Sequence, residues 1–207
     1  MREKGGVRLP GVEILPVGTR RALRQFIDFP YRLYKDDPYW VPPLRIAQRE
    51  LFDKHKHPFH AHAEVQCFLA LQNQRPVGRI AAILDRNFNE FHHEQAGAFG
   101  FFETINSQEV AAALLHAAQQ WLRERGAHVM RGPMNPSTNY ECGLLVDGFN
   151  HSPRLMMTYN FPFYGQLIEK TGLWKAKDLY AYHGLPTQTA NTFTELRLLR
   201  IFLGPRR

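Results

Sequence analysis

Cysteine and long apolar runs are both scarce in this sequence. Its 207 residues contain two cysteines, Cys67 and Cys142, too few for the disulfide framework of a small secreted domain. No stretch reaches the roughly 20 apolar residues that cross a bilayer, and the charged start leads into no apolar signal-peptide core. We therefore expect a cytoplasmic protein with buried thiols and no membrane partner.

The sequence also lacks the short motifs of several common enzyme classes. It contains no G-x-S-x-G nucleophile elbow, no P-loop and no G-x-G-x-x-G dinucleotide motif. A zinc site needs three or four converging ligands. The clustered histidines come with neither paired cysteines nor an H-E-x-x-H pattern; they are His55, His57, His60, His62, His92 and His93. We therefore expect no metal.

An excess of positive charge is missing from the middle of the chain. The net charge of +7 comes from the ends: residues 1–24 hold six basic and two acidic side chains, and residues 187–207 hold four and one. The residues between them hold 16 of each sign. A groove for nucleic acid needs basic side chains on one folded face, so a nucleic-acid partner is not expected.

The length and composition that remain fit one globular domain. The chain is 44% hydrophobic and 22% charged, near the average for folded proteins, and its length suits one core. We expect this domain to occupy residues 1–186. The basic segment 187–207 is interpreted as a C-terminal tail, altered or truncated.

Apolar periodicity predicts seven strands. They are expected at residues 12–17, 64–72, 76–85, 97–103, 128–131, 155–159 and 173–183, with the second and third joined as a hairpin.

Helices are predicted by a 3.6-residue period and by their caps. One is expected from Thr19 to Pro30, two more over residues 44–52 and 163–171, and a long one after Asn106, which forms a capping-box variant with Glu109. In the tail, Thr192 and Glu195 predict a short helix that holds Leu196, Leu199 and Phe202.

Residues 97–132 contain a strand, a helix and a strand in succession. Such units normally make parallel strands with a right-handed crossover. We therefore expect an α/β fold with a mixed central sheet flanked by helices, in which this parallel pair splays into a V. The opening should face a polar loop, residues 135–141, because ligands gather at the carboxyl ends of such strands.

Two segments, together with this order of elements, resemble the GNAT superfamily of acyl-CoA N-acyltransferases. Residues 167–173, Leu-Ile-Glu-Lys-Thr-Gly-Leu, are similar to the late-helix signature LYEKLGF, with Asn160 in place of a preceding asparagine. Residues 131–145 look like those of a divergent, largely uncharacterised bacterial branch. The resemblance covers about residues 12–186.

The resemblance implies an acyltransferase that uses acyl-CoA or acetyl-CoA and acylates the amine of a small molecule. In the family, a Q/R-x-x-G-x-G/A loop holds the CoA pyrophosphate at a helix N-terminus. The corresponding loop here, residues 103–109, has no glycine and carries two carboxylates, which would repel a pyrophosphate. The candidate cofactor-binding residues are Phe102, Glu103, Asn106, Ser107 and Asn160. A second hypothesis is a binding or regulatory module that keeps the fold without the chemistry.

The tyrosine that many family members use as a general acid is replaced by Ile168. Tyr164 lies one turn earlier on the same helix face and is the candidate acid; the alternative is a core tyrosine with a satisfied hydroxyl. Asn139, in the polar loop, or Asn160 is the candidate for positioning the acyl carbonyl. Glu141 or Glu103 is the candidate base. The alternative for this loop is a tight turn that bonds its own backbone.

Overall fold

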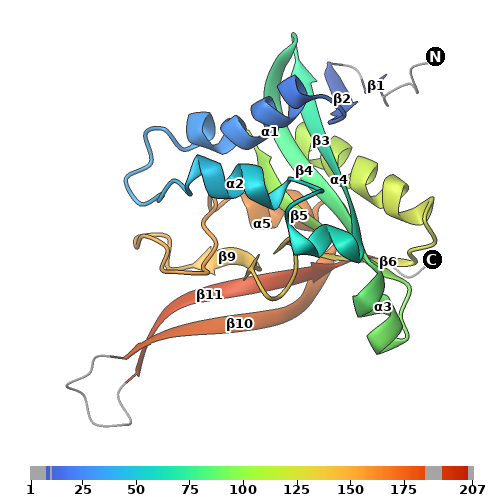
Figure 1. Cartoon of the computed structure of the whole chain (residues 1–207). Helices are drawn as coiled ribbons and strands as arrows, with labels where there is room; N and C mark the ends of the chain where they lie inside the picture. The colour runs from blue at the N-terminus through green and yellow to red at the C-terminus, as the bar shows by residue number, and fades with distance from the viewer. Residues whose placement is uncertain (1–7, 10, 185–192, 205–207) are drawn as a thin grey trace.

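A single sheet of nine strands forms the centre of the computed structural model, which describes residues 8–9, 11–184 and 193–204 (Figure 1). The strand order is β1-β2-β3-β4-β5-β6-β11-β10, and β9 also pairs with β11. The strands are β1 (Arg8–Leu9), β2 (Val12–Pro16), β3 (Ala63–Gln72), β4 (Arg75–Asp85), β5 (Ala96–Thr104), β6 (Val129–Gly132), β9 (Leu144–Asp147), β10 (Trp174–Gly184) and β11 (Phe193–Leu203). The mixed sheet flanked by helices is confirmed.

Helices cover both faces of this sheet. They are α1 (Arg20–Leu33), α2 (Arg45–Leu51), α3 (Arg86–His92), α4 (Gln108–Arg123) and α5 (Tyr164–Glu169), with a 3-10 turn at Pro58–Ala61. Figure 1 shows α1 and α2 in front of the sheet and α4 behind it. The core is accordingly divided between an α4 side, which includes α5, and an α1 side.

The hairpin and the long helix are confirmed. β3 and β4 pair along their whole length around a turn in which Asn73 and Gln74 have positive φ, as tight hairpin turns require. The helix cap, however, lies one residue later than predicted. Ser107, not Asn106, accepts the hydrogen bond from Val110 N at 3.4 Å.

The parallel pair and its opening are also confirmed. β5 and β6 pair only over Ala96–Ala98 and Val129–Arg131. Beyond these residues the strands separate, and a short ribbon of β7 (Met134–Asn135) and β8 (Glu141–Cys142) begins the polar loop. Gly100 allows the ribbon to approach, because a Cβ atom there would lie 1.7 Å from the Met134 carbonyl oxygen.

The prediction that α1 ends at Pro30 was wrong, because the helix continues to Leu33. A proline inside a helix leaves the carbonyl four residues earlier without its N–H donor. Here that carbonyl belongs to Phe26, and Arg79 Nη1 on β4 donates to it at 3.0 Å. A side chain from the sheet therefore replaces the missing backbone donor.

The C-terminal third departs most from the sequence expectations. The helix expected around Leu199 and Phe202 is instead strand β11, which lies between β10 and β6 in the sheet. Residues 155–159, expected as a strand, form turns and irregular backbone, and β9 and α3 were not expected. Residues 187–192 and 205–207 of the expected tail, with Thr192, lie outside the described residues. The division at residue 186 stays a prediction.

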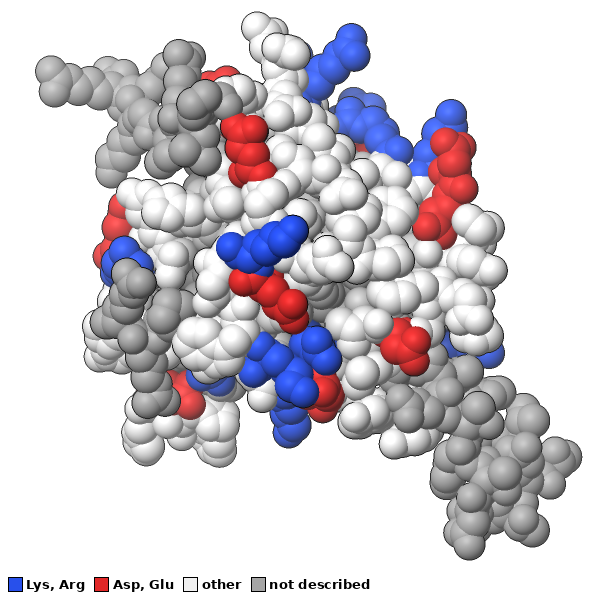
Figure 2. Space-filling view, turned by 180° about the vertical axis from the view of Figure 1, so that it is seen from behind, with Lys and Arg blue, Asp and Glu red and all other residues white. Residues whose placement is uncertain are grey.

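Charge and membrane signals can be checked on the described surface. Figure 2 shows the face opposite to that of Figure 1, where basic and acidic side chains are interspersed. Among the described residues, no helix is long and apolar enough to cross a membrane, and no three metal-binding side chains converge. Cys67 is buried as expected, whereas Cys142 is half-buried.

Candidate active site

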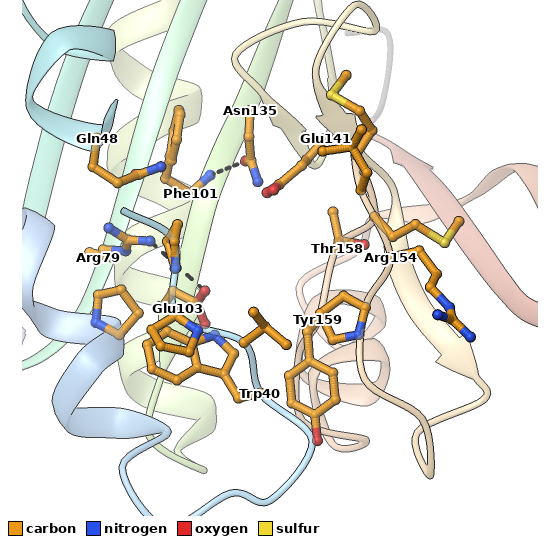
Figure 3. A pocket seen from close by; sticks show the side chains of 18 residues that line it. Trp40, Gln48, Arg79, Phe101, Glu103, Asn135, Glu141, Arg154, Thr158 and Tyr159 are labelled. Atoms are coloured by element: carbon orange, nitrogen blue, oxygen red, sulfur yellow. Dashed lines mark hydrogen bonds and ion pairs between the residues drawn. The ribbon is translucent and has the colours of Figure 1, made fainter. Parts of the chain in front are cut away.

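A cavity of about 390 Å³ opens where β5 separates from β6, between α1 and the polar loop. Figure 3 shows Arg79 and Glu103 on one wall and Glu141, Thr158 and Tyr159 on the other. The outer walls are mostly apolar; their residues are Trp40, Val41, Pro42, Pro43, Pro153, Leu155, Met156 and Met157. The cavity therefore combines a polar inner end with an apolar entrance.

Glu103 supplies the carboxylate at the inner end. It lies near the end of β5, and its side chain is only 14% exposed. Its Oε2 atom accepts a hydrogen bond from the Tyr34 hydroxyl and lies 3.0 Å from the Tyr164 hydroxyl, while Arg79 Nη2 is 3.9 Å from Oε1. The carboxylate thus faces the cavity with fixed partners behind it.

Burial raises the pKa of Glu103 to about 7, despite the nearby Arg79 charge and the two tyrosine hydroxyls, which lower it. Glu141 adds a like charge across the cavity, which also raises the pKa. A carboxylate with a pKa near neutrality exchanges a proton readily at physiological pH. Glu103 is therefore suited to act as a general base.

Arg79 is the cation at the inner end of the cavity and was missed by the sequence analysis. It is 5% exposed, and its guanidinium lies 4.9 Å from the centre of the Phe26 ring. It lines the cavity, and its Nε atom is buried without a hydrogen-bond partner among the described residues. The available signal was its place as the one charge in the apolar run 76–84, together with Pro30 in the helix pattern.

Tyr34 was also missed, because the sequence analysis assigned no element or role to the residues between Pro30 and residue 44. It is fully buried at the end of α1, its ring stacks on Trp40 with 5.2 Å between centroids, and its hydroxyl reaches Glu103 from 69 residues away. Its contact with β5 depends on tertiary packing.

A backbone irregularity connects β5 to the polar loop. Phe101 has a φ of 51° at a bulge of β5. Residues other than glycine rarely adopt this backbone conformation, which often marks functional sites. The Phe101 N–H donates to Asn135 Oδ1 at 2.6 Å. Desolvation of its carboxyl group against the cavity wall raises the pKa of nearby Glu141, although the residue as a whole is exposed, and a hydrogen bond from Asn135 opposes the rise. The loop therefore brings Asn135 and Glu141 to the cavity.

Tyr164, the expected acid, lies behind Glu103 and is fully buried. Its hydroxyl accepts from Thr104 N at 2.8 Å and lies 3.0 Å from Glu103 Oε2. Burial raises its pKa well above the usual value. The hydroxyl therefore has hydrogen-bond partners, as the core-tyrosine alternative expects. Two of these partners, Glu103 and Tyr34, belong to the hydrogen-bonded group at the inner end of the cavity.

The remaining predicted residues are spread around this site. Asn139 is exposed, and its backbone N–H donates to Ser137 Oγ at 3.2 Å within the turn. Asn160 is buried; its Oδ1 accepts from Leu145 N at 2.7 Å, and its Nδ2 donates to the Leu145 carbonyl oxygen at 3.1 Å. Phe102 points into the α4 side of the core. Asn106 and Ser107 lie at the start of α4, and Ser107 caps it.

The clustered histidines make separate contacts. His62 Nδ1 lies 2.9 Å from Asp85 Oδ1, and His60 Nε2 lies 2.9 Å from the Leu51 carbonyl oxygen. Burial and neighbouring His60 lower the pKa of His57, which faces Tyr140 of the polar loop at 3.5 Å.

Comparison by sequence finds two curated bacterial relatives, and no family model matches. The chain is 36% identical over 190 residues to the "Bacterial ceramide synthase" of Caulobacter vibrioides, and this alignment covers 91% of the chain and 50% of that protein. It is 39% identical over 164 residues to "Protein YghO" of Escherichia coli, covering 79% of this chain and 42% of that protein. The chain therefore spans about half the length of the curated relatives it matches.

Comparison by structure finds solved acetyltransferases with the same arrangement. An N-acetyltransferase from Staphylococcus aureus aligns over 95% of this chain and 99% of its own, with a TM-score of 0.57 and 9% identity. A tandem GNAT protein from clavulanic acid biosynthesis aligns over 86% of this chain and 53% of its own, with a TM-score of 0.55 and 12% identity. With its splayed parallel pair and the cavity beside it, this chain has the fold of the GNAT superfamily.

Proposed function

We propose that the chain catalyses acyl transfer from acyl-CoA to an amine, with Glu103 as the general base. The observation that carries this proposal is a largely buried carboxylate with a pKa of about 7, placed in a cavity at the opening of the parallel pair. The fold supports the reaction class by analogy, and the residues of the cavity supply the chemistry.

The proposed reaction removes two protons from the acceptor. An alkylamine is largely protonated at neutral pH, so it loses the first proton to solvent before its nitrogen attacks the thioester carbonyl. In our proposal Glu103 takes the second proton from the nitrogen as the C–N bond forms. The C–S bond then breaks, the CoA thiolate leaves, and the proton held by Glu103 converts the thiolate to the thiol, so that one proton is released overall. Arg79 and the two tyrosines hold the carboxylate in place.

The acceptor is proposed to carry an apolar chain. The inner end of the cavity has two carboxylates against Arg79, which suits an ammonium group, and the entrance walls suit hydrocarbon. The name of the Caulobacter relative supports this class, because a ceramide is the N-acyl derivative of a long-chain amine.

The donor is proposed to bind at the start of α4, beside Asn106 and Ser107. The helix is capped by the Ser107 hydroxyl, and the Glu103 carboxylate is turned toward the cavity. Glu109, an exposed side chain in the first turn, is then the one carboxylate of this loop that would repel the CoA pyrophosphate. The absence of glycine in this loop is the observation that favours the alternative, a binding module without acyl transfer.

The test is release of CoA thiol from acyl-CoA in the presence of primary amines of increasing chain length. General base catalysis contributes typically about 10²–10⁴-fold, so Glu103→Gln should lower turnover by that order. Glu124→Gln, at the C-terminal end of α4, is the matched control and should leave turnover unchanged.

Three results would count against this assignment. Equal rates for wild type and Glu103→Gln would remove Glu103 from the mechanism. No thiol release by wild type, together with a thermal shift on adding acyl-CoA, would favour the binding module. No preference for longer amines would contradict the apolar acceptor.

A further inference from the structure

Exposed apolar side chains gather around the mouth of the cavity. Ten large apolar side chains are exposed in the described part of the chain, and six of them lie in two short segments, residues 39–46 and 155–156. They are Tyr39, Val41, Leu44, Ile46, Leu155 and Met156, with Leu155 at 93% exposure. Val41, Leu155 and Met156 also line the cavity. Such a concentration of apolar side chains marks an interaction surface more often than chance.

The same two segments contain arginine and no acidic residue. Residues 38–49 and 148–163 lack aspartate and glutamate, although the chain has 19, and they contain Arg49, Arg154 and Arg45, of which Arg45 pairs with Asp28 at 3.0 Å. Figure 3 shows Arg154 on the outer wall, with its guanidinium directed away from Glu103. We call residues 38–49 and 148–163 together the rim. Apolar side chains interspersed with arginine match the interface of an anionic bilayer.

The rim segment before α2 is held rigidly enough to keep these side chains in water. Trp40 stacks on Tyr34, the Tyr31 hydroxyl donates to the Pro43 carbonyl at 2.6 Å, and prolines occupy positions 38, 42 and 43. Asp37 adjoins the rim, as Glu50 and Asp147 do, and it is turned inward, where it accepts from the Tyr159 hydroxyl at 2.8 Å. The apolar side chains therefore cannot easily fold back onto the core.

We propose that the rim docks on the surface of an anionic lipid bilayer, with the mouth of the cavity facing the lipid. A protein partner seated on these side chains would close the cavity, whereas a lipid surface would bury them and leave the mouth open to molecules within the bilayer. The sequence expectation of no membrane partner concerned spanning segments, and peripheral docking leaves no such signal. The inference stands apart from the proposed chemistry, since lipid binding needs no acyl transfer.

The test is flotation of the protein with vesicles of phosphatidylcholine and phosphatidylglycerol in equal parts, compared with phosphatidylcholine alone. We expect wild type to float with the anionic vesicles and to be released by high salt. Leu44→Asp combined with Leu155→Asp should lower the partition coefficient at least about tenfold. The matched control is Phe91→Asp on α3, an equally exposed aromatic outside the rim, which should change partition less than about twofold.

A second pair of variants separates charge from apolar contact. Each arginine near an anionic surface contributes about 1 kcal/mol, or roughly fivefold. Arg49→Gln with Arg154→Gln should therefore lower partition about tenfold or more on anionic vesicles and leave phosphatidylcholine binding unchanged.

Several outcomes would overturn the proposal. They are no flotation of wild type, an equal loss with Phe91→Asp, or wild-type dimers in analytical ultracentrifugation that Leu155→Asp dissociates without vesicles. The last result would assign the rim to a second copy of this chain. Melting temperatures measured beside each variant show that it is folded.

Discussion

The sheet buries apolar side chains under α4, whereas under α1 it also buries Arg79 beside Glu103. On the α4 side, Leu114 and Phe99 are fully buried in a continuous apolar cluster. On the α1 side, the apolar cluster ends at an ionisable group whose pKa is raised by burial. Buried apolar contacts raise the free energy of unfolding, whereas a buried carboxylate lowers it and is retained where a reactive group is needed. The difference separates the face that stabilises this protein from the face to which we assign the proposed chemistry.

The largest expected effect on stability comes from the α4 side. Leu114→Ala leaves a cavity in a packed site, and such changes cost about 2–5 kcal/mol. Urea denaturation should show this loss, while turnover per folded molecule stays near the wild-type value. Leu44→Ala, at an exposed position, is the control and should change the free energy of unfolding by less than about 0.5 kcal/mol. A comparable loss in both variants would break the comparison between the faces.

Glu103→Gln should raise the free energy of unfolding, in contrast to Leu114→Ala, and the size of this effect should depend on pH. The pKa of Glu103 is about 7 in the folded state and near 4.5 when unfolded. The folded state therefore holds a proton that the unfolded state has lost, and stability falls as pH rises from about 4.5 to 7. Removing the carboxyl should restore up to about 3 kcal/mol above pH 7 and little at pH 4.

Melting temperatures of wild type and Glu103→Gln across pH 4–9 measure this difference. Curves that remain parallel across the whole range would show that Glu103 titrates normally, and would contradict the buried base.

Arg79 and Pro30 should be coupled by about 1 kcal/mol. Arg79→Met leaves the Phe26 carbonyl without a donor, and Pro30→Ala supplies a backbone N–H to the same oxygen. The double variant should therefore be more stable than the sum of the single changes predicts. A strictly additive cycle would show that the guanidinium does not replace the proline's missing donor.

The smallest expected effect is a shift in pH dependence. The hydroxyls of Tyr34 and Tyr164 lower the pKa of Glu103, so Tyr34→Phe and Tyr164→Phe should move the acid limb of the pH–rate profile to higher pH. At alkaline pH both variants should approach wild-type turnover if the tyrosines only position the base. A loss of about 10²–10⁴-fold at all pH values in Tyr164→Phe alone would instead support its role as the acid.

Local patterns were enough to predict the parts of the fold that depend on neighbours in sequence. The β3–β4 hairpin follows from its polar turn, and α4 from its apolar stripe and its C-terminal glycine, Gly126. Strand β11 could not be predicted in this way. Leu199 and Phe202 are three residues apart, as on a helix, but both are buried because β11 is an inner strand covered on two faces.

The candidate site was predicted only in part, for a similar reason. Glu141 was named from its polar loop, which follows a strand at an end where ligands gather, and Glu103 from the loop that corresponds to the family's cofactor-binding loop. Tyr34 and Arg79 reach the same cavity from distant segments, and their roles depend on how α1 lies on β4 and β5. Asn160 was named through the family resemblance, and the structure places it as a clamp on β9.

Because β11 lies inside the sheet, several strands cannot complete their pairing until β11 has been synthesised. β6, β9 and β10 all pair with β11 but leave the ribosome before it. Until residues 193–203 are made, each of these strands presents an open edge that another chain can pair with. A pause in translation after residue 184 would lengthen that exposure, and we expect aggregation of the nascent chain to rise with the length of the pause.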